Sequence, residues 1–274
     1  MEQTIIVLTS FLLSSSMFIF WVAKGGFNRR YLYTDNILLG AVSSVIGLFL
    51  HHIISIQFIL FVVILSPLIV FLLFVGLFFF RFFRNPKRVI SGDRNDILAP
   101  ADGRIIYIKE LEVNQAPVSI KRKQVANISE ITKTDILIQP CYLIGIAMTL
   151  FDVHYNRAPI DGEIVLVKHT DGTAIGLNTP ESTLTNERNT MVFSREDGVM
   201  AGIVQIAARG VRRCIVMTKE GAKVTRGEII GKIRWGSQTD LIIPRNTDIK
   251  VREGDQVYAG ITVIGKLNDE PTIR

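Results

Sequence analysis

Long apolar segments near the amino terminus constrain this chain more than any other feature. Residues 4–23 are almost uninterrupted in apolar or small side chains, and residues 36–80 form a second apolar block about two helix lengths long. Roughly 20 apolar residues in one helix cross a bilayer, because each backbone polar group must find its partner within the segment. The mean hydropathy of +0.33 is high for a chain of 274 residues and reflects this block. The sequence therefore predicts a membrane anchor followed by a soluble part.

Basic residues flank the apolar segments, three of them within residues 24–30 and four within residues 81–88. Basic loops stay on the cytoplasmic side, so an even number of crossings should separate the two groups. We therefore predict three helices, over about residues 4–23, 37–55 and 57–80, with the amino terminus outside. Two crossings, with part of residues 36–80 in the interface, are the alternative. A signal peptide is disfavoured, since no positive charge precedes the first segment and no small-x-small cleavage site follows it.

The charge and the cysteines exclude some classes of function. The net charge of +6 is concentrated beside the apolar segments, where basic residues meet anionic lipid, so we expect no nucleic-acid partner. Cys141 and Cys214 have no zinc-site spacing and are predicted to be buried free thiols. His51 and His52 are adjacent and lack further ligand candidates nearby, so a loop between two spans explains them better than a metal site.

After residue 88 the pattern changes to short β-branched runs separated by Asp-Gly, Gly-Asp and Pro turns. This pattern predicts one mainly β, β-sandwich-like domain over residues 89–274. Residues 229–233 and 251–260 resemble the strand-turn units of lipoyl and biotinyl carrier domains. Residues 178–185 are polar and irregular and are predicted to form a loop that leads into residues 186–189 and can serve a binding site.

A Gly-Ser step, Gly236-Ser237, lies between two apolar runs typical of buried strands. Glycine leaves its carbonyl open to approach, which a serine hydroxyl that attacks its own preceding peptide bond would require. The pair is also common in ordinary turns. The Gly-Ser step alone therefore does not distinguish a self-cleavage site from a turn.

Four other stretches accompany this step: Phe83-Arg84-Asn85-Pro86, Ala99-Pro100-Ala101-Asp102-Gly103, Phe151-Asp152-Val153-His154-Tyr155-Asn156-Arg157-Ala158-Pro159 and Asn186-Glu187-Arg188-Asn189. In this order and with these spacings, the chain after residue 80 resembles the phosphatidylserine decarboxylase family, particularly its shorter bacterial and archaeal branch. Members usually carry Leu or Phe before the Gly-Ser step, and Trp235 stands there in this chain.

The resemblance implies self-cleavage between Gly236 and Ser237 into a large chain, 1–236, and a small chain, 237–274, that stay together as a heterodimer or a higher oligomer. Ser237 would become a pyruvoyl group that condenses with the amine of phosphatidylserine and accepts electrons as CO2 leaves, without pyridoxal phosphate or a metal. The product would be phosphatidylethanolamine, or its archaeal equivalent. His154 is the candidate general acid and base, and Asp102 would orient that histidine or stabilise its charge.

One residue departs from the longer branch of the family, where a second histidine of the self-cleaving triad stands at the place of Arg157. Either His154 serves both reactions or another group replaces the missing base, and His169 ranks second as a base. Arg157, Arg188 and Asn189 are the candidate substrate-binding residues, since an anionic head group needs cationic partners.

The membrane segments suit a lipid substrate, and we expect the catalytic domain on the cytoplasmic side of the inner membrane. The alternative function is a membrane-anchored carrier or adaptor that never cleaves itself. It is disfavoured because the modifiable lysine tripeptides Met-Lys-Met and Asp-Lys-Ala do not occur. An inactive family member is the third possibility, disfavoured by the joint presence of Asp102, His154, Gly236 and Ser237.

Overall fold

The computed structural model describes residues 1–54, 56–112, 119–120, 124–125, 128–137, 140–173, 185–207, 214–233 and 237–268. The chain divides into two compact units. The first comprises Met1–Arg84 and Thr149–Phe151, and the second comprises Asn85–Met148 and Asp152–Arg274. The predicted domain boundary after residue 88 lies close to the first of these divisions. No local pattern in the sequence indicates that residues 149–151 belong to the first unit.

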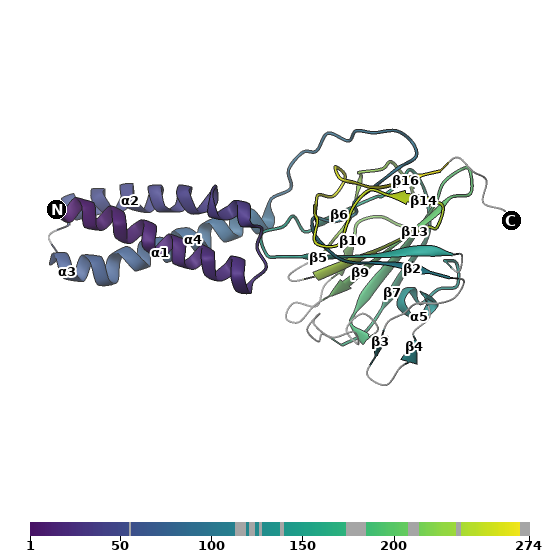
Figure 1. The fold of residues 1–274 in the computed structure, drawn as a ribbon, viewed down its shortest axis with the longest axis horizontal. Coiled ribbons are helices and arrows are strands. Elements are labelled where there is room, and N and C mark those ends of the chain that lie inside the picture. The colour runs from purple at the N-terminus through teal and green to yellow at the C-terminus, as the bar shows by residue number, and fades with distance from the viewer. Residues whose placement is uncertain are drawn as a thin grey trace. The chain divides into compact units, whose positions relative to one another are not determined.

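The first unit is helical, and Figure 1 shows α1, α2 and α4 lying side by side within it. Three helical stretches, residues 2–24, 29–53 and 58–83, are long and apolar enough to cross a membrane. The helices are α1 (Glu2–Lys24), η1 (Arg29–Leu32), α2 (Asp35–Ile53), α3 (Phe58–Leu60), η2 (Phe61–Leu65) and α4 (Ser66–Phe83). His51 and His52 belong to the last turn of α2 and not to the predicted loop after it.

Small polar groups and aromatic rings hold the helices together. Asp35 is fully buried and accepts a hydrogen bond of 2.9 Å from Nε of Arg81. Phe151 packs in a cluster that includes Phe18 and Phe74, with ring centroids 6.2 Å and 6.1 Å away. Many large apolar side chains of these helices point outward, which is the distribution expected of helices that face lipid.

The second unit is mainly β, as predicted, and contains one short helix, α5 (Ile128–Thr132), among its described residues. Its largest sheet has eight antiparallel strands in the order β11-β7-β8-β9-β13-β5-β2-β15. Smaller sheets have the orders β10-β12-β6, β1-β16-β14 and β3-β4. The strands are β1 (Asp96–Leu98), β2 (Gly103–Leu111), β3 (Ser119–Ile120), β4 (Gln124–Val125), β5 (Cys141–Met148), β6 (Tyr155–Arg157), β7 (Gly162–Thr170), β8 (Arg188–Ser194), β9 (Met200–Ala207), β10 (Cys214–Val216), β11 (Lys223–Val224), β12 (Ile229–Ile233), β13 (Ser237–Pro244), β14 (Thr247–Ile249), β15 (Gln256–Val257) and β16 (Val263–Leu267).

The eight-stranded sheet is covered on both faces, because successive side chains of a strand point to opposite sides. On one face, Leu241 and Ile243 of β13 join the larger core together with Ile230 and Ile233 of β12. On the other face, Ile242 joins a smaller core with side chains from α5 and the residues after it. Polar residues of the central strands are therefore also buried, and successive ones lie on opposite faces of the sheet.

Candidate functional site

Ser237 is the first residue of β13, a central strand of the eight-stranded sheet. Its backbone pairs with Met148 on β5 and with Ala207 on β9. Gly236 and the two residues before it lie outside the described residues, as does the side chain of Ser237. In the sequence, the predicted cleavage site falls between the end of β12 at Ile233 and the start of β13 at Ser237.

His154 lies beside the last residue of β12. Its carbonyl oxygen accepts a hydrogen bond of 3.0 Å from the backbone N–H of Ile233, the last residue of β12. Strand β6, which begins one residue after His154, pairs with β12. The side chain of His154 is buried, with 2% of the residue exposed. The predicted base is therefore held by its own backbone to the strand that leads into the cleavage site.

Asp102 is held by Arg88, one of the four basic residues within residues 81–88 that follow the apolar segments. Two hydrogen bonds of 2.6 Å and 2.8 Å join the guanidinium to the two carboxylate oxygens, and both side chains are almost fully buried. The N–H of Ala259 also donates to Asp102, at 2.8 Å. Among the described residues, the carboxylate is thus bonded to Arg88 and Ala259 and not to His154. The predicted role of Asp102 in orienting that histidine stays a prediction.

The turn that carries Asp102 is packed closely against the central sheet. Gly103 has φ of +150°, and a Cβ at this position would lie 2.3 Å from the carbonyl oxygen of Ala147. Only glycine fits such an approach. The same turn reaches the His154 segment through a hydrogen bond of 2.9 Å from the N–H of Arg157 to the carbonyl of Pro100. The Asp102 and His154 segments are therefore adjacent.

Arg157 also lies near Asp102. Its guanidinium donates to the carbonyl of Gly227 at 2.7 Å and to Oδ1 of Asn85 at 3.4 Å. Burial and the neighbouring Arg88 lower the pKa of Arg157, and Asp102 partly opposes this shift. Two guanidinium groups thus accompany one carboxylate, which leaves the cluster with a net positive charge.

Arg188 lies on the face of the sheet that carries the smaller core. It is 1% exposed, and its guanidinium donates to the carbonyls of Asn186 and Ile131 at 3.1 Å each. Burial lowers the pKa of Arg188 to about 10, and the nearby Asp240 opposes this shift. Burial also raises the pKa of Asp240 to about 6, although Gln238 and Tyr107 donate hydrogen bonds to its Oδ1. Arg188 therefore has the surroundings of a structural residue, and its predicted role in substrate binding stays a prediction.

Asn189 points to the face of the larger core, where it bonds to Gln205 at 3.1 Å and to His169 at 2.7 Å. His169 is half exposed, and Nε2 of its ring lies 3.2 Å from Asp171. The hydrogen bond with Asn189 is the largest cause that raises the pKa of His169. The second-ranked base thus lies at the edge of the sheet, connected to the interior by side-chain hydrogen bonds. Substrate binding by Asn189 stays a prediction.

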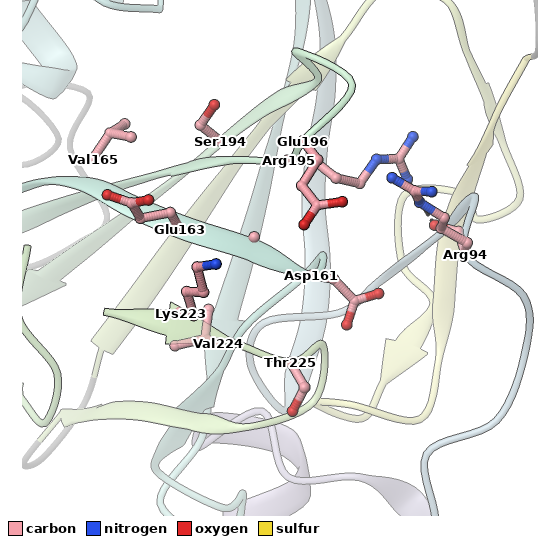
Figure 2. A pocket seen from close by; sticks show the side chains of 11 residues that line it. Arg94, Asp161, Glu163, Val165, Ser194, Arg195, Glu196, Lys223, Val224 and Thr225 are labelled. Carbon is pink, nitrogen blue, oxygen red and sulfur yellow. Dashed lines mark hydrogen bonds between the residues drawn. The ribbon is translucent and has the colours of Figure 1, made fainter. Parts of the chain in front are cut away.

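An open hollow of about 470 Å³ lies elsewhere on the second unit (Figure 2). Three cationic and three anionic side chains line it, together with Val165, Ser194, Val224 and Thr225; the charged ones are Arg94, Arg195, Lys223, Asp161, Glu163 and Glu196. None of the predicted site residues contributes to it. Its balanced charge gives no preference for an anionic head group, so we do not assign it to the site.

Comparison with known proteins supplies the family. The model of the family described as phosphatidylserine decarboxylase matches residues 75–265. A protein of Methanocaldococcus jannaschii, provisionally named archaetidylserine decarboxylase proenzyme, is 43% identical over 190 residues, which cover 69% of this chain and 89% of that protein.

Bacterial relatives are named phosphatidylserine decarboxylase proenzyme. The protein of Ralstonia pickettii is 34% identical over 192 residues, which cover 70% of this chain and 80% of the relative. The protein of Magnetococcus marinus is 32% identical over 186 residues, which cover 68% of this chain and 76% of the relative.

Proposed function

Because the chain belongs to the phosphatidylserine decarboxylase family, we propose that it removes the carboxylate of a serine phospholipid as CO2 after cleaving itself between Gly236 and Ser237. The observation that supports this most strongly is the position of the His154 segment. The carbonyl of His154 accepts a hydrogen bond from Ile233, which precedes the Gly-Ser step. Asn156 donates a hydrogen bond of 3.0 Å to Thr239, which follows that step. Both sides of the scissile bond are thus tied to the segment of the candidate base.

The cleavage proposed for this site uses the chain's own groups. Oγ of Ser237 bonds to the carbonyl carbon of Gly236 while the peptide C–N bond breaks, and the hydroxyl proton passes through His154 to the new amine. Loss of the Cα proton then breaks the Cβ–O bond and frees the Gly236 carboxylate. Water replaces the nitrogen of the remaining dehydroalanine, which releases ammonia and leaves a pyruvoyl group at residue 237.

The pyruvoyl group supplies an electron-withdrawing carbonyl that accepts the electrons of the departing carboxylate. A terminus at residue 237 suits this role, because β13 is anchored on both sides by β5 and β9 and would hold the group in place. His154 is the proposed proton donor to the product. Asp102 on the adjoining turn, Arg157 of β6 and Arg88 form the net positive cluster, and we assign Arg157 to the anionic head group.

The three apolar helices of the first unit are compatible with membrane association. We place them in the inner membrane with the second unit in the cytoplasm, where Arg84 and Lys87 would meet anionic lipid. The cleaved chains, 1–236 and 237–274, stay together in this proposal because β13 of the small chain pairs with β5 and β9 of the large one.

Intact mass spectrometry of the purified protein in detergent tests the proposal. We expect two chains, the smaller one beginning with pyruvoyl at residue 237, and release of CO2 from phosphatidylserine or archaetidylserine vesicles. Ser237→Ala should abolish both cleavage and decarboxylation, while Ser194→Ala, in the hollow of Figure 2, should leave both intact. Decarboxylation by the Ser237→Ala protein would refute the pyruvoyl chemistry, and a wild-type chain that stays whole would favour the adaptor function.

A further inference from the structure

A row of polar side chains crosses the eight-stranded sheet at one level. Strand register sets His169 opposite Asn189, Asn189 opposite Gln205, and Gln205 opposite Thr239. Residues directly opposite each other on antiparallel strands carry their side chains on the same face, about 5 Å apart. The row therefore spans β7, β8, β9 and β13 on the face of the larger core.

Asn156 of β6 joins this row from the facing sheet. Nε2 of Gln205 donates to Oδ1 of Asn156 at 2.8 Å, and Nδ2 of Asn156 donates to Oγ1 of Thr239 at 3.0 Å. Further out, Nδ2 of Asn189 donates to Oε1 of Gln205 at 3.1 Å. Oδ1 of Asn189 lies 2.7 Å from Nδ1 of His169, and because an amide oxygen only accepts, that ring nitrogen carries the proton.

All these hydrogen bonds run in the same direction. Each amide turns its oxygen toward His169 and its nitrogen toward Thr239. A flip of Gln205 would bring like groups together on both sides, and a flip of Asn156 would set its Nδ2 against Nε2 of Gln205. The row thus fixes the orientation of the Asn156 amide. Gly231 leaves the room that this needs, because a Cβ there would lie 2.7 Å from Nε2 of Gln205.

Burial makes the arrangement costly to disturb. Asn156, Gln205 and Thr239 are fully buried, and Asn189 is 2% exposed. A buried polar group that loses its partner costs roughly 1–3 kcal/mol, and the groups of one network support one another. Apolar side chains would fill the same core without this cost. The row therefore suggests that the position of its inner end has a function.

The inner end connects the three segments of the candidate site. Asn156 lies two residues after His154, and Thr239 lies two residues after Ser237. Nδ2 of Asn156 also lies 3.4 Å from the carbonyl of Pro100, two residues before Asp102. One side-chain amide therefore links the segments that carry the candidate base, the nucleophile and the carboxylate.

We propose that Asn156 is a positioning residue for self-cleavage, whose amide holds the strand of Ser237 in register with the His154 segment while the row from His169 keeps that amide oriented. The inference rests on the proposed function, because it assumes cleavage at Gly236-Ser237. The essential part is donation from Asn156 to Thr239, since among the described side chains of the row this bond reaches the strand of the nucleophile.

Asn156→Asp tests this donation in the full-length protein. A neutral aspartic acid can still accept from Gln205 and donate to Thr239, whereas the carboxylate cannot donate. Burial favours the neutral form at moderate pH. We therefore expect cleavage of the variant to slow at least tenfold from pH 6 to pH 8, as the acid ionises. Wild-type cleavage, which needs a neutral base, should not slow over this range.

The matched control is Asn36→Asp, the same change at a residue of the first unit whose Nδ2 also donates to a hydroxyl, Oγ of Ser15, at 3.0 Å. Both variants should melt at a lower temperature as pH rises, but only Asn156→Asp should lose cleavage with pH when both are incubated well below their melting temperatures. An Asn156→Asp protein with the pH profile of wild type, or an Asn36→Asp protein that also slows, overturns the positioning role. A wild-type protein that stays whole overturns the proposed function itself.

A second pair of variants applies if Asn156→Asp does not fold. Thr239→Val keeps the shape of the side chain but removes the acceptor, and Thr239→Ser keeps the hydroxyl. Cleavage of the valine variant should be at least tenfold slower than that of the serine variant at any pH where both are folded. Equal rates for the two would overturn the proposal.

Discussion

The ion pair between Arg88 and Asp102 is the buried contact whose loss should be easiest to measure. The side chains of the pair are 4% and 3% exposed, and two hydrogen bonds of 2.6 Å and 2.8 Å join them. Arg88→Ala would leave the Asp102 carboxylate with only the N–H of Ala259 as a hydrogen-bond donor among the described residues. Removal of one partner from a buried pair costs about 3–5 kcal/mol, because the remaining charge loses its hydrogen-bonded partner without regaining water.

For a unit of this size, 1 kcal/mol corresponds to about 2–4 °C, so Arg88→Ala should lower the melting temperature by about 6–20 °C. We would measure unfolding by circular dichroism in detergent, with every variant in a Ser237→Ala background so that cleavage does not alter the chain. The double variant Arg88→Leu, Asp102→Leu should regain much of the loss, since it leaves no buried charge.

Lys250→Ala is the matched control. It removes an ion pair with Asp248 in which the two side chains are 49% and 54% exposed. Exposed pairs contribute about 0–1 kcal/mol, so this variant should melt within about 4 °C of the parent. If Arg88→Ala lowers the melting temperature no more than Lys250→Ala does, burial does not make the Arg88–Asp102 pair contribute more to stability than an exposed pair.

Two further predictions concern Asp240 and Gly103. Burial raises the pKa of Asp240 from 3.8 to about 6, so ionisation of this residue lowers the free energy of unfolding as pH rises through this range. Asp240→Asn should therefore raise the free energy of unfolding by up to about 3 kcal/mol at pH 8, but by little below pH 4. Urea unfolding at both pH values measures this gain; a gain that does not grow with pH would contradict burial as its cause. Gly103→Ala should cost about 2–4 kcal/mol, because its Cβ would meet the Ala147 carbonyl. Gly254→Ala, at φ of +91° with open space around it, should cost only about 1 kcal/mol, and equal melting temperatures for the two would contradict the clash.

Much of this architecture could be predicted from local patterns. Apolar segments of helix length indicated three membrane-compatible helices, and β-branched runs between turns indicated a mainly β domain. The Gly236-Ser237 step and the spacing of four further motifs indicated the family, which the comparisons confirm. These features depend on residue type and on spacing along the chain, so a sequence contains them directly.

Partners far apart in sequence could not be predicted in this way. Arg88 belongs to a basic group that suggested a membrane surface, yet its guanidinium is buried against Asp102. Arg188 and Asn189 are neighbours in one motif, but alternation along β8 sends their side chains to opposite faces of the sheet. Asn156 lies in the motif of residues 151–159, but the sequence predicted no role for it, because its bond to Thr239 joins residues 83 positions apart.

The sequence by itself determined the class of each segment and the family, because hydrophobic periodicity and motif spacing are local properties. Only the tertiary structure decided which polar groups meet, because strand order and register bring β6, β9 and β13 together across the larger core. A buried polar group must find its partner wherever the fold provides one, and that partner is set by packing in three dimensions and not by distance along the chain.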